Sequence, residues 1–262
     1  MKIVVTVKLV PDTNADKRID PGTKRLVRTG VETVLNPFDE YAIEAALQLK
    51  EKSGADSTVT VVAMAPEAGK EVVRKALAMG ADDAVMLSDA GCEGSDVYGT
   101  AYALAAAIKK TGFDLVVCGT QSTDATTGEL PGALAEFLGV PGLTNVRKFE
   151  VDGTSLKAER ETDDGFLRVT ASLPLLVSVT KSINEPRYPS LKGIMGAKKK
   201  TIAVQSLADA GVDKPIGLEG ARTELVDVTT PPARGKGEIF EAADAVAGAQ
   251  KIVDFLRQRK LV

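Results

Sequence analysis

Apolar residues in the first half of the chain occur in strand-length runs, and each run is followed by a turn and then by a helical pattern. The strand-like runs are 2–10, 58–64, 84–87 and 114–118. Apolar residues then recur at helical spacing in 36–53, 66–79, 95–110 and a last segment that ends at 138. Because near-continuous apolar strands alternate with helices, we predict an α/β fold, with a mostly parallel sheet covered by helices on both faces.

The pattern changes beyond Gly139, where strand-like segments follow one another with only short polar turns between them. These segments are 143–151, 155–161, 166–173 and 175–180. Tight turns join antiparallel neighbours, so we predict antiparallel strands added to the parallel sheet. Two prolines and two glycines in 182–197 argue against a helix or a central strand, so this segment is predicted to be a loop that precedes a short strand, 201–204.

Three further features complete the predicted organisation. Turn residues at Asp20–Thr23 predict a β-hairpin within 17–35, and Asn36 with Pro37 begins the next helix as its cap and first position. Near the C-terminus, prolines and glycines between 229 and 237 predict a linker, followed by a helix from about Ile239 to Arg259. We therefore expect a nucleotide-binding-type α/β domain, 1–225, and a C-terminal arm, 226–262, whose helix packs on another chain.

The composition excludes several classes of chemistry. The chain has no histidine and only two cysteines, Cys92 and Cys118, so it lacks the residues for Ser-His-Asp triads, HExxH zinc sites or four-thiolate clusters. We expect no catalytic residue and no metal site on this chain. Catalysis of any demanding reaction would then depend on a cofactor, on a partner chain, or on carboxylates and lysines.

Charge and hydropathy exclude fewer classes of function than the composition does. A net charge of −3 and a pI near 5.3 argue against nucleic acid as a partner. The apolar runs are far shorter than the roughly 20 residues that span a bilayer, so we expect no membrane-spanning segment. No targeting segment is recognised in the first residues, which favours a cytoplasmic protein.

The segment Gly119–Gly128 is the most informative candidate for a binding site. It follows a predicted buried strand, and in open α/β sheets ligands bind at the carboxyl ends of the strands, beside helix N-termini. Its hydroxyl groups could surround a phosphate without a lysine, although an ordinary polar loop is equally compatible with the pattern. No GxGxxG or GxxxxGK[ST] motif occurs, which disfavours an NAD-dependent dehydrogenase and a P-loop NTPase. Asp124 would repel a phosphate, so we expect it to cap or orient the loop.

Two surface segments are less specific by pattern alone. The mixed charges of 159–164 are typical of a solvated hairpin tip, and nothing nearby indicates a carboxylate with a perturbed pKa. The segment 188–195 places Leu191, Ile194 and Met195 among prolines and glycines, as a partner-binding tip or as part of the core.

Taken together, these residues resemble the β (small) subunit family of electron-transfer flavoproteins over essentially the whole chain. The last of the matching motifs is long and specific. The motifs are VTVKLVPD at 5–12, NPFDEYAIEAALQLKEK at 36–52, KALAMGAD at 75–82, GTQSTD at 119–124, ERETDDG at 159–165 and INEPRYPSLKGIMGAKKK at 183–200.

The resemblance implies a three-layer fold like that of the adenine-nucleotide α-hydrolases, and a heterodimer with a larger α subunit. In this family the α subunit holds most of a redox-active FAD, and the β subunit buries an AMP with a structural role. The heterodimer carries electrons from dehydrogenases, often acyl-CoA dehydrogenases, to a membrane quinone oxidoreductase. Fatty acid oxidation is the expected setting, in the cytoplasm of a bacterium or in the mitochondrial matrix of a eukaryote.

The resemblance also assigns residues to roles. It places Leu191 at the anchor of a partner-recognition loop (about 182–200) that includes Tyr188, Ile194 and Met195, and it makes Glu161 the tether of the α subunit's mobile flavin domain. The positions that match the nucleotide site are Thr6, Asn36, Pro37, Phe38, Asp39, Met64, Gly119, Thr120, Gln121, Ser122, Thr123, Asp124, Thr126, Thr127 and Gly128.

One departure from the family leaves the nucleotide open. Many members end this loop with a D-x-x-x-Q-T-G-type sequence, where this chain has Ala125–Pro131, and Glu129 and Pro131 remove polar contacts. The alternatives are an electron-bifurcating flavoprotein subunit with a second FAD in this site, and a stand-alone, stress-type protein that binds adenine nucleotides. ATP hydrolysis and adenylyl transfer are less favoured, because no phosphate-gripping motif is present.

Overall fold

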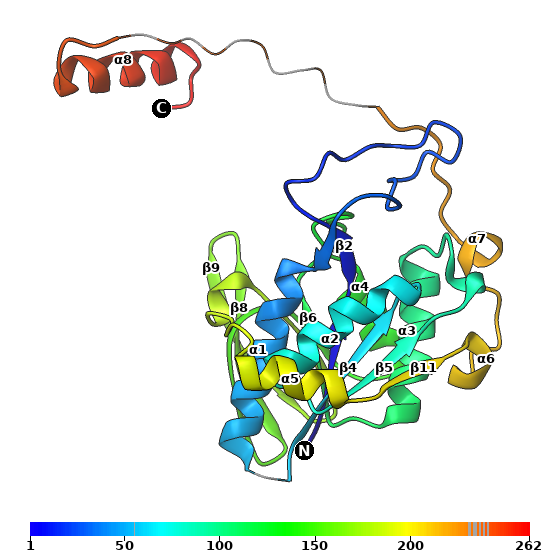
Figure 1. Cartoon of the computed structure of the whole chain (residues 1–262). Helices are drawn as coiled ribbons and strands as arrows, with labels where there is room; N and C mark the ends of the chain where they lie inside the picture. Colours follow the sequence, from blue (N-terminus) through cyan, green and yellow to red (C-terminus); the bar gives the residue numbers. More distant parts are fainter. Residues whose placement is uncertain (55, 230–231, 233–234, 236, 238, 240) are drawn as a thin grey trace. The chain divides into compact units, whose positions relative to one another are not determined.

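The computed structural model describes residues 1–54, 56–229 and 241–262, together with residues 232, 235, 237 and 239. The chain divides into two compact units, Met1–Val226 and Asp227–Val262. Figure 1 shows the elements of the first unit arranged around one central sheet.

The first unit contains a nine-stranded sheet in the order β11-β5-β4-β1-β6-β10-β7-β8-β9. The strands from β11 to β7 run parallel to their neighbours, and β7, β8 and β9 are antiparallel. Their bounds are β1 Lys2–Val7, β4 Thr58–Met64, β5 Asp83–Leu87, β6 Leu115–Gly119, β7 Gly142–Asp152, β8 Ser155–Thr162, β9 Gly165–Ser172, β10 Leu175–Val179 and β11 Ile202–Gln205. The α/β class, the mostly parallel sheet and the added antiparallel strands are therefore confirmed.

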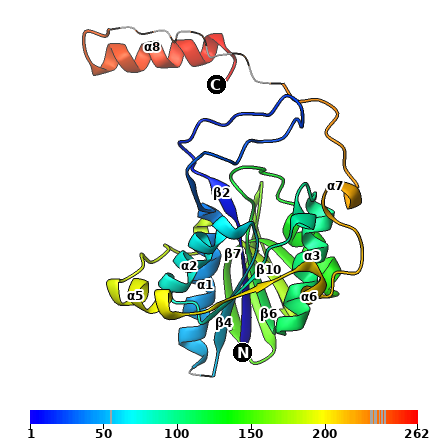
Figure 2. The same ribbon diagram turned by 45° about the vertical axis from the view of Figure 1, so that its right-hand side comes forward.

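Helices cover both faces of this sheet, so its central strands are buried on each side (Figure 2). One face carries α1 (Pro37–Ser53), α2 (Lys70–Met79) and α5 (Leu191–Lys199). The other carries α3 (Val97–Thr111), α4 (Leu130–Leu138) and α6 (Leu207–Ala210). The two apolar cores lie between these helices and the sheet, which makes the three layers that the resemblance implied.

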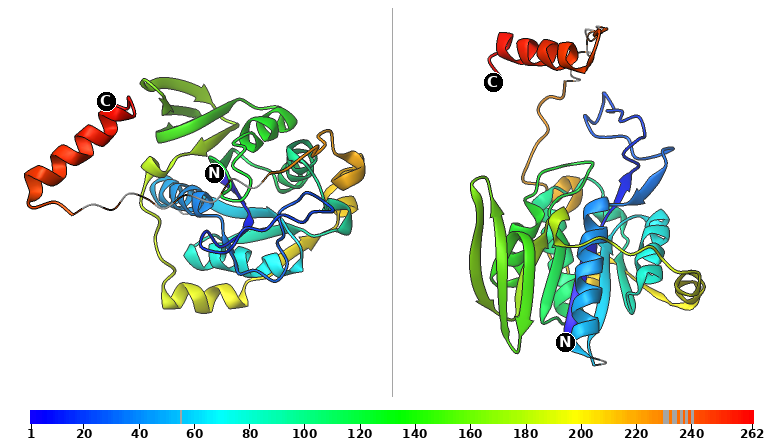
Figure 3. Two further views of the ribbon diagram at one scale, coloured as in Figure 1. Left: turned by 90° about the horizontal axis from the view of Figure 1, so that it is seen from above. Right: turned by 90° about the vertical axis from the view of Figure 1, so that its left-hand side faces the viewer.

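The antiparallel strands form one edge of the sheet, as the right-hand view of Figure 3 shows. The sequence prediction grouped 175–180 with these strands, and this was wrong for β10. All five residues of β10 are buried, and the strand lies between β6 and β7, parallel to both. Its continuous apolar sequence, Leu175–Val179, is typical of a strand covered on both faces.

The N-terminal region differs from the prediction in two ways. The predicted strand 2–10 is interrupted at Lys8, so β1 ends at Val7 and β2 (Leu9–Pro11) pairs with β3 (Thr33–Leu35) in a separate antiparallel sheet. The predicted hairpin within 17–35 is reduced to the Asp20–Thr23 turn and a single antiparallel bridge between Ile19 and Leu26. β3 therefore pairs with β2 and not with a partner inside its own segment.

Short helices fill the remaining connections. They are the 3₁₀ turns η1 (Glu67–Gly69), η2 (Ala90–Cys92) and η3 (Lys181–Ile183), and the single turn α7 (Gly217–Gly220).

The second unit contains α8, Ala245–Gln258. Asp244 caps the N-terminus of this helix, because its side chain accepts a hydrogen bond from the backbone N–H of Ala247. The predicted start near Ile239 was too early, because 241–244 are not helical. Within the predicted linker, Thr230, Pro231 and Lys236 lie outside the described residues. The packing of α8 on another chain stays a prediction.

Candidate functional site

The candidate nucleotide site lies where β1, β4 and β6 end, beside the start of α1. Thr6 and Met64 come from the ends of two paired strands, β1 and β4, and Gly119 ends β6 on the other side of β1. The loop 119–129 then leads to α4, whose first N–H groups have no partner within the helix. The fold thus brings together the strand ends, a hydroxyl-rich loop and a helix N-terminus.

The side chain of Asn36 joins the start of α1 to this loop. Its Nδ2 donates to the carbonyl oxygen of Gln121 (2.9 Å) and to Asp39 Oδ1 (2.8 Å), while its Oδ1 accepts from the backbone N–H of Thr123 (3.2 Å). Asn36 is the N-cap residue of α1 and Pro37 its first residue, as predicted, but the buried Asn36 side chain makes no capping hydrogen bond to the helix. It holds the loop in place instead.

Gly119 makes the close approach between loop and helix possible. A Cβ at this position would lie 2.6 Å from Asp39 Oδ1 and 2.8 Å from the carbonyl carbon of Phe38. Any side chain would force the loop away from α1. Pro37 and Phe38 are half-buried next to it, and the Lys181 ammonium lies 4.9 Å from the centre of the Phe38 ring.

Asp39 is a buried carboxyl group at the centre of this junction. Its Oδ2 accepts a hydrogen bond from the backbone N–H of Lys8 (2.8 Å), where the strand β1 has just ended. Burial raises the pKa of Asp39 to about 7, and the hydrogen bonds from Asn36 and Lys8 only partly offset it. The group therefore changes its protonation near neutral pH.

Asp124 anchors the middle of the loop through two cations. It accepts from Lys8 Nζ (2.7 Å) and from Arg28 Nη2 (2.7 Å) and Nε (3.2 Å), and its side chain is 1% exposed. Burial opposes ionisation, but Lys8 and Arg28 outweigh it and lower the pKa of Asp124 to about 2. Lys8 Nζ also donates to Ser122 Oγ (3.1 Å). Asp124 thus orients the loop, and its charge is balanced within the chain.

The threonines of the loop divide into engaged and free hydroxyl groups. Thr120 Oγ1 donates to the Val179 carbonyl oxygen (2.7 Å), whereas Thr123 Oγ1 is buried and has no hydrogen-bond partner. Thr126, Thr127 and Gly128 are exposed. A buried hydroxyl without a partner is unfavourable unless a ligand satisfies it. This hydroxyl, the exposed ones and the start of α4 fit the oxygen atoms of a nucleotide phosphate.

The second half of the predicted partner-recognition loop is a helix, α5 (Leu191–Lys199), whereas 184–190 has no regular secondary structure. Ser190 Oγ accepts from the Gly193 N–H (3.0 Å) and begins α5, so the prolines lie before the helix and do not interrupt it. Tyr188, Leu191, Ile194 and Met195 are all exposed, by 94%, 76%, 41% and 60%. An apolar group of this kind on the surface is typical of a protein-binding site.

Glu161 lies apart from both sites, near the end of β8 and opposite Phe166 in the register. It is half-buried, and within the described chain its carboxylate makes no hydrogen bond or ion pair. Its neighbour Glu159 is different, because Arg147 and Arg168 both bind its carboxylate. Glu161 is thus the carboxylate of this strand that is open to an external partner.

Sequence reasoning did not find the roles of Lys8 and Arg28. They are far from Asp124 along the chain, and no local pattern marks a long-range ion pair. The quoted motif VTVKLVPD contains Lys8, which is the one signal that could have directed attention to it.

Neither a metal centre nor a membrane span is found in the part of the chain that the structure describes. No group of His, Cys, Asp or Glu side chains there could hold a metal ion, and none of the described helices is both long and apolar enough to cross a bilayer.

Comparison with known proteins agrees with this architecture. The family model of the electron transfer flavoprotein domain matches residues 23–210. The electron transfer flavoprotein subunit beta of Mycobacterium tuberculosis is 43% identical over 265 residues, covering 99% of each chain. The subunit beta of Thermoanaerobacterium thermosaccharolyticum is 42% identical over the whole of both chains, and the caffeyl-CoA reductase-Etf complex subunit CarD of Acetobacterium woodii is 36% identical over the same extent. On the strength of a match to most of the chain and of full-length relatives at this identity, the chain belongs to the electron transfer flavoprotein β-subunit family.

Proposed function

We propose that this chain pairs with an α subunit to form an electron transfer flavoprotein, in which it is a non-catalytic subunit. The complex would carry electrons from flavin dehydrogenases, such as acyl-CoA dehydrogenases, to a membrane quinone oxidoreductase. Family membership supports the pairing, and a chain without histidine suits a role in which a bound flavin supplies the redox chemistry. Most of the contacts to FAD would come from the α subunit. A cytoplasmic location is part of the proposal and is supported by the bacterial origin of the relatives named above.

The β chain would hold an AMP with a structural role. The observation that carries this part is the buried, unpartnered hydroxyl of Thr123 in a loop that Asn36 and Asp124 hold in place. Thr123, Ser122, Thr126 and Thr127, with the N-terminus of α4, would bind the phosphate. Thr6, Met64 and the segment Asn36–Asp39 would surround the nucleoside.

Heat release of nucleotides from the purified heterodimer tests this assignment. The released compounds are separated and counted against the protein concentration. One FAD and one AMP per heterodimer is the expected result. The release of one FAD and no AMP per heterodimer would contradict a nucleotide site in this chain.

A second candidate function is electron bifurcation, with FAD in place of AMP in the β site. The similarity to the Acetobacterium woodii protein, whose name places it in a caffeyl-CoA reductase-Etf complex, favours this candidate. The open end of the loop at Thr126–Gly128 supports it, because a larger nucleotide could extend there. Two FAD per heterodimer and no AMP would establish bifurcation as the better reading.

Docking of dehydrogenases would use the exposed end of α5. Leu191 is the most exposed of the aliphatic side chains there, and we propose that it inserts into an apolar pocket of the dehydrogenase. Glu161 would contact the α subunit's flavin domain and hold it in its resting position.

Truncation of Leu191 tests the docking assignment. Leu191→Ala should slow electron transfer from a reduced acyl-CoA dehydrogenase to the heterodimer by about tenfold or more, and leave the flavin absorption spectrum unchanged. Leu225→Ala is a matched control, since Leu225 is 50% exposed in a different segment. Equal transfer rates for both variants and the unmodified protein would refute the anchor role of Leu191.

A further inference from the structure

Helix α5 contains two glycines, and only one of them is explained by packing within the chain. A Cβ on Gly193 would lie 2.4 Å from the carbonyl oxygen of Ala78 in α2. The absence of a side chain at Gly193 therefore allows α5 to lie directly on α2. No such reason applies to Gly196, because, apart from its two chain neighbours and the backbone of its own helix, no atom lies within 4 Å of the position that its Cβ would occupy.

Gly196 is also not required by the backbone. Its φ angle is not in the left-handed region, and it lies within the hydrogen-bonded part of α5, where alanine stabilises a helix more than glycine does. An alanine would thus fit and would strengthen the helix. The chain carries a glycine at an exposed position where folding alone favours alanine.

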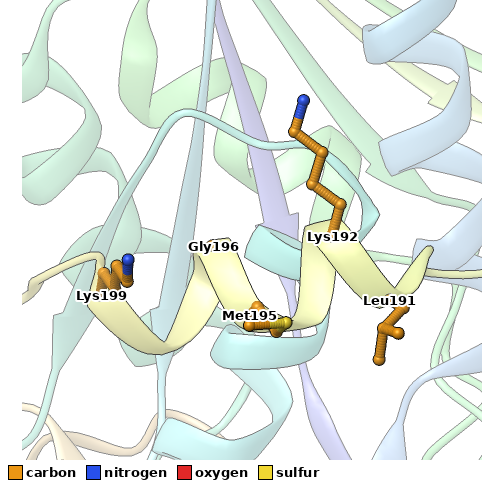
Figure 4. A pocket seen from close by; sticks show the side chains of 5 residues that line it. All are labelled: Leu191, Lys192, Met195, Gly196 and Lys199. Carbon is orange, nitrogen blue, oxygen red and sulfur yellow. The ribbon is translucent and has the colours of Figure 1, made fainter.

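The position of Gly196 indicates what the missing side chain is for. Gly196 is one of the residues that line a surface hollow on α5, and Figure 4 shows where these residues lie on the helix. The hollow is also lined by two apolar side chains, Leu191 and Met195, and by two basic ones, Lys192 and Lys199. In the part of the chain that the structure describes, neither lysine's ammonium group makes an ion pair or a hydrogen bond.

The helix is held firmly enough to present this hollow in one orientation. Arg74 Nη1 of α2 donates to the carbonyl oxygens of Ala197 (2.6 Å) and Lys200 (2.8 Å) at the end of α5. On the N-terminal side, Arg187 binds the carboxylates of Glu44 (2.7 Å) and Glu51 (2.6 Å) on α1. A surface fixed at both ends loses little conformational entropy on binding.

We infer that Gly196 determines which partners fit the docking surface, because its hollow receives an apolar side chain of the dehydrogenase that is flanked by carboxylates. The apolar walls set the character of the inserted side chain, and Lys192 and Lys199 set the charge around it. This inference rests on the proposed docking function of α5. It adds a recess in this chain to the protruding Leu191, so that the two surfaces interlock.

The test uses the complete heterodimer and an acyl-CoA dehydrogenase of the same organism, reduced with its acyl-CoA substrate. For Gly196→Ala we expect the KM for the reduced dehydrogenase to rise about tenfold, with the maximal rate unchanged and the thermal midpoint equal or higher. An unchanged KM would overturn the inference. A lowered midpoint would overturn it too, since the glycine would then serve packing within the chain.

Charge variants test the second half of the inference. Lys192→Gln together with Lys199→Gln should raise the KM and make it less dependent on salt, whereas Lys109→Gln, on the last turn of α3, is the matched control and should change neither. A salt dependence identical to that of the unmodified protein would refute the carboxylate requirement.

If the unmodified heterodimer accepts no electrons from the dehydrogenase, the proposed docking function itself fails. Equal transfer by the unmodified and Gly196→Ala proteins contradicts only the role of Gly196.

Discussion

At the scale of single residues, the candidate nucleotide site is built from buried polar groups that are almost all paired with one another. Both the nitrogen and the oxygen of the Asn36 side-chain amide form hydrogen bonds, and the Asp124 carboxylate binds the two cationic side chains of Lys8 and Arg28. Because such groups are costly to leave unpaired in the interior, each one restricts where its partner can lie. Thr123 Oγ1 is the exception among these groups, and a ligand would complete it.

Replacement of Thr123 by valine separates ligand binding from folding. Thr123→Val removes a hydroxyl that has no partner in the chain, so the free energy of unfolding of the nucleotide-free protein should not fall. Nucleotide dissociation should become several-fold faster, as measured by the loss of AMP during gel filtration. In contrast, Thr120→Val loses the hydrogen bond to Val179 and should cost about 1 kcal/mol of stability. A loss of stability in Thr123→Val without faster release would contradict this division.

Asp39 should make stability depend on pH. Its pKa is about 7 in the folded chain and 3.8 in the reference state, so between these values the folded chain keeps a proton that the unfolded chain has released. The contribution of Asp39 to the free energy of unfolding is therefore highest below about pH 4. It decreases as the pH rises to about 7 and is constant above that pH. The total decrease is at most about 4 kcal/mol.

Asp39→Asn is the reference for this effect, because it cannot ionise. We expect the difference in unfolding free energy between the unmodified protein and Asp39→Asn to change in favour of the variant from pH 4 to pH 7. Urea unfolding at several pH values measures it, and a difference that is independent of pH would show that Asp39 does not titrate in this range.

At the scale of helices and strands, the sequence pattern predicted the elements themselves better than their neighbours in the sheet. The parallel strands β1, β4, β5 and β6 and the antiparallel β7–β9 were found because period and turn signals are local. β10 was placed wrongly because its partners, β6 and β7, are chosen by burial in the sheet and not by the preceding turn. Likewise, α5 was missed because prolines and glycines were counted together, although Pro186 and Pro189 precede the Ser190 cap.

Local sequence signals likewise predicted the segments of the candidate site but not the contacts between them. The loop 119–128 and the start of α1 were identified from the strand-to-helix pattern, because both follow strand ends. The contact between them depends on the absence of a side chain at Gly119, and the Arg28–Asp124 pair depends on how the 12–32 segment folds back. No periodicity in the sequence reports such distances.

Gly193→Ala tests how α5 is attached to α2. The new Cβ would meet the Ala78 carbonyl oxygen at 2.4 Å, so the helix must shift, at a cost of about 1–3 kcal/mol. Urea unfolding should show this loss, whereas Gly196→Ala, in the same helix, should show no loss. Two equal unfolding curves would mean that α5 is not packed on α2 through Gly193.

At the scale of the whole molecule, the division into two units makes a prediction about assembly. The second unit contains α8, which carries the apolar residues Val246, Ile252, Phe255 and Leu256, and within the described residues none of the helix is buried. An exposed amphipathic helix is typically covered by a partner. We expect the α subunit to cover it.

Removal of residues 227–262 tests this expectation. The shortened chain should keep the thermal midpoint of the first unit within a few degrees, because the core lies within Met1–Val226. After co-expression with the α subunit, sizing should show no stable heterodimer, while the full chain forms one. A full chain that is stable alone and does not bind the α subunit would instead favour the stand-alone nucleotide-binding protein.

The central position of β10 has a consequence for synthesis on the ribosome. The strands β1, β4, β5 and β6 emerge first, and until residues 175–179 follow, the outer edge of β6 has unpaired N–H and C=O groups. An apolar strand with an open edge readily pairs with other chains. Nascent chains that stall between α4 and β10 should therefore aggregate or recruit chaperones more than chains that stall after β10, in which only the outer edge of β5 still awaits its partner, β11.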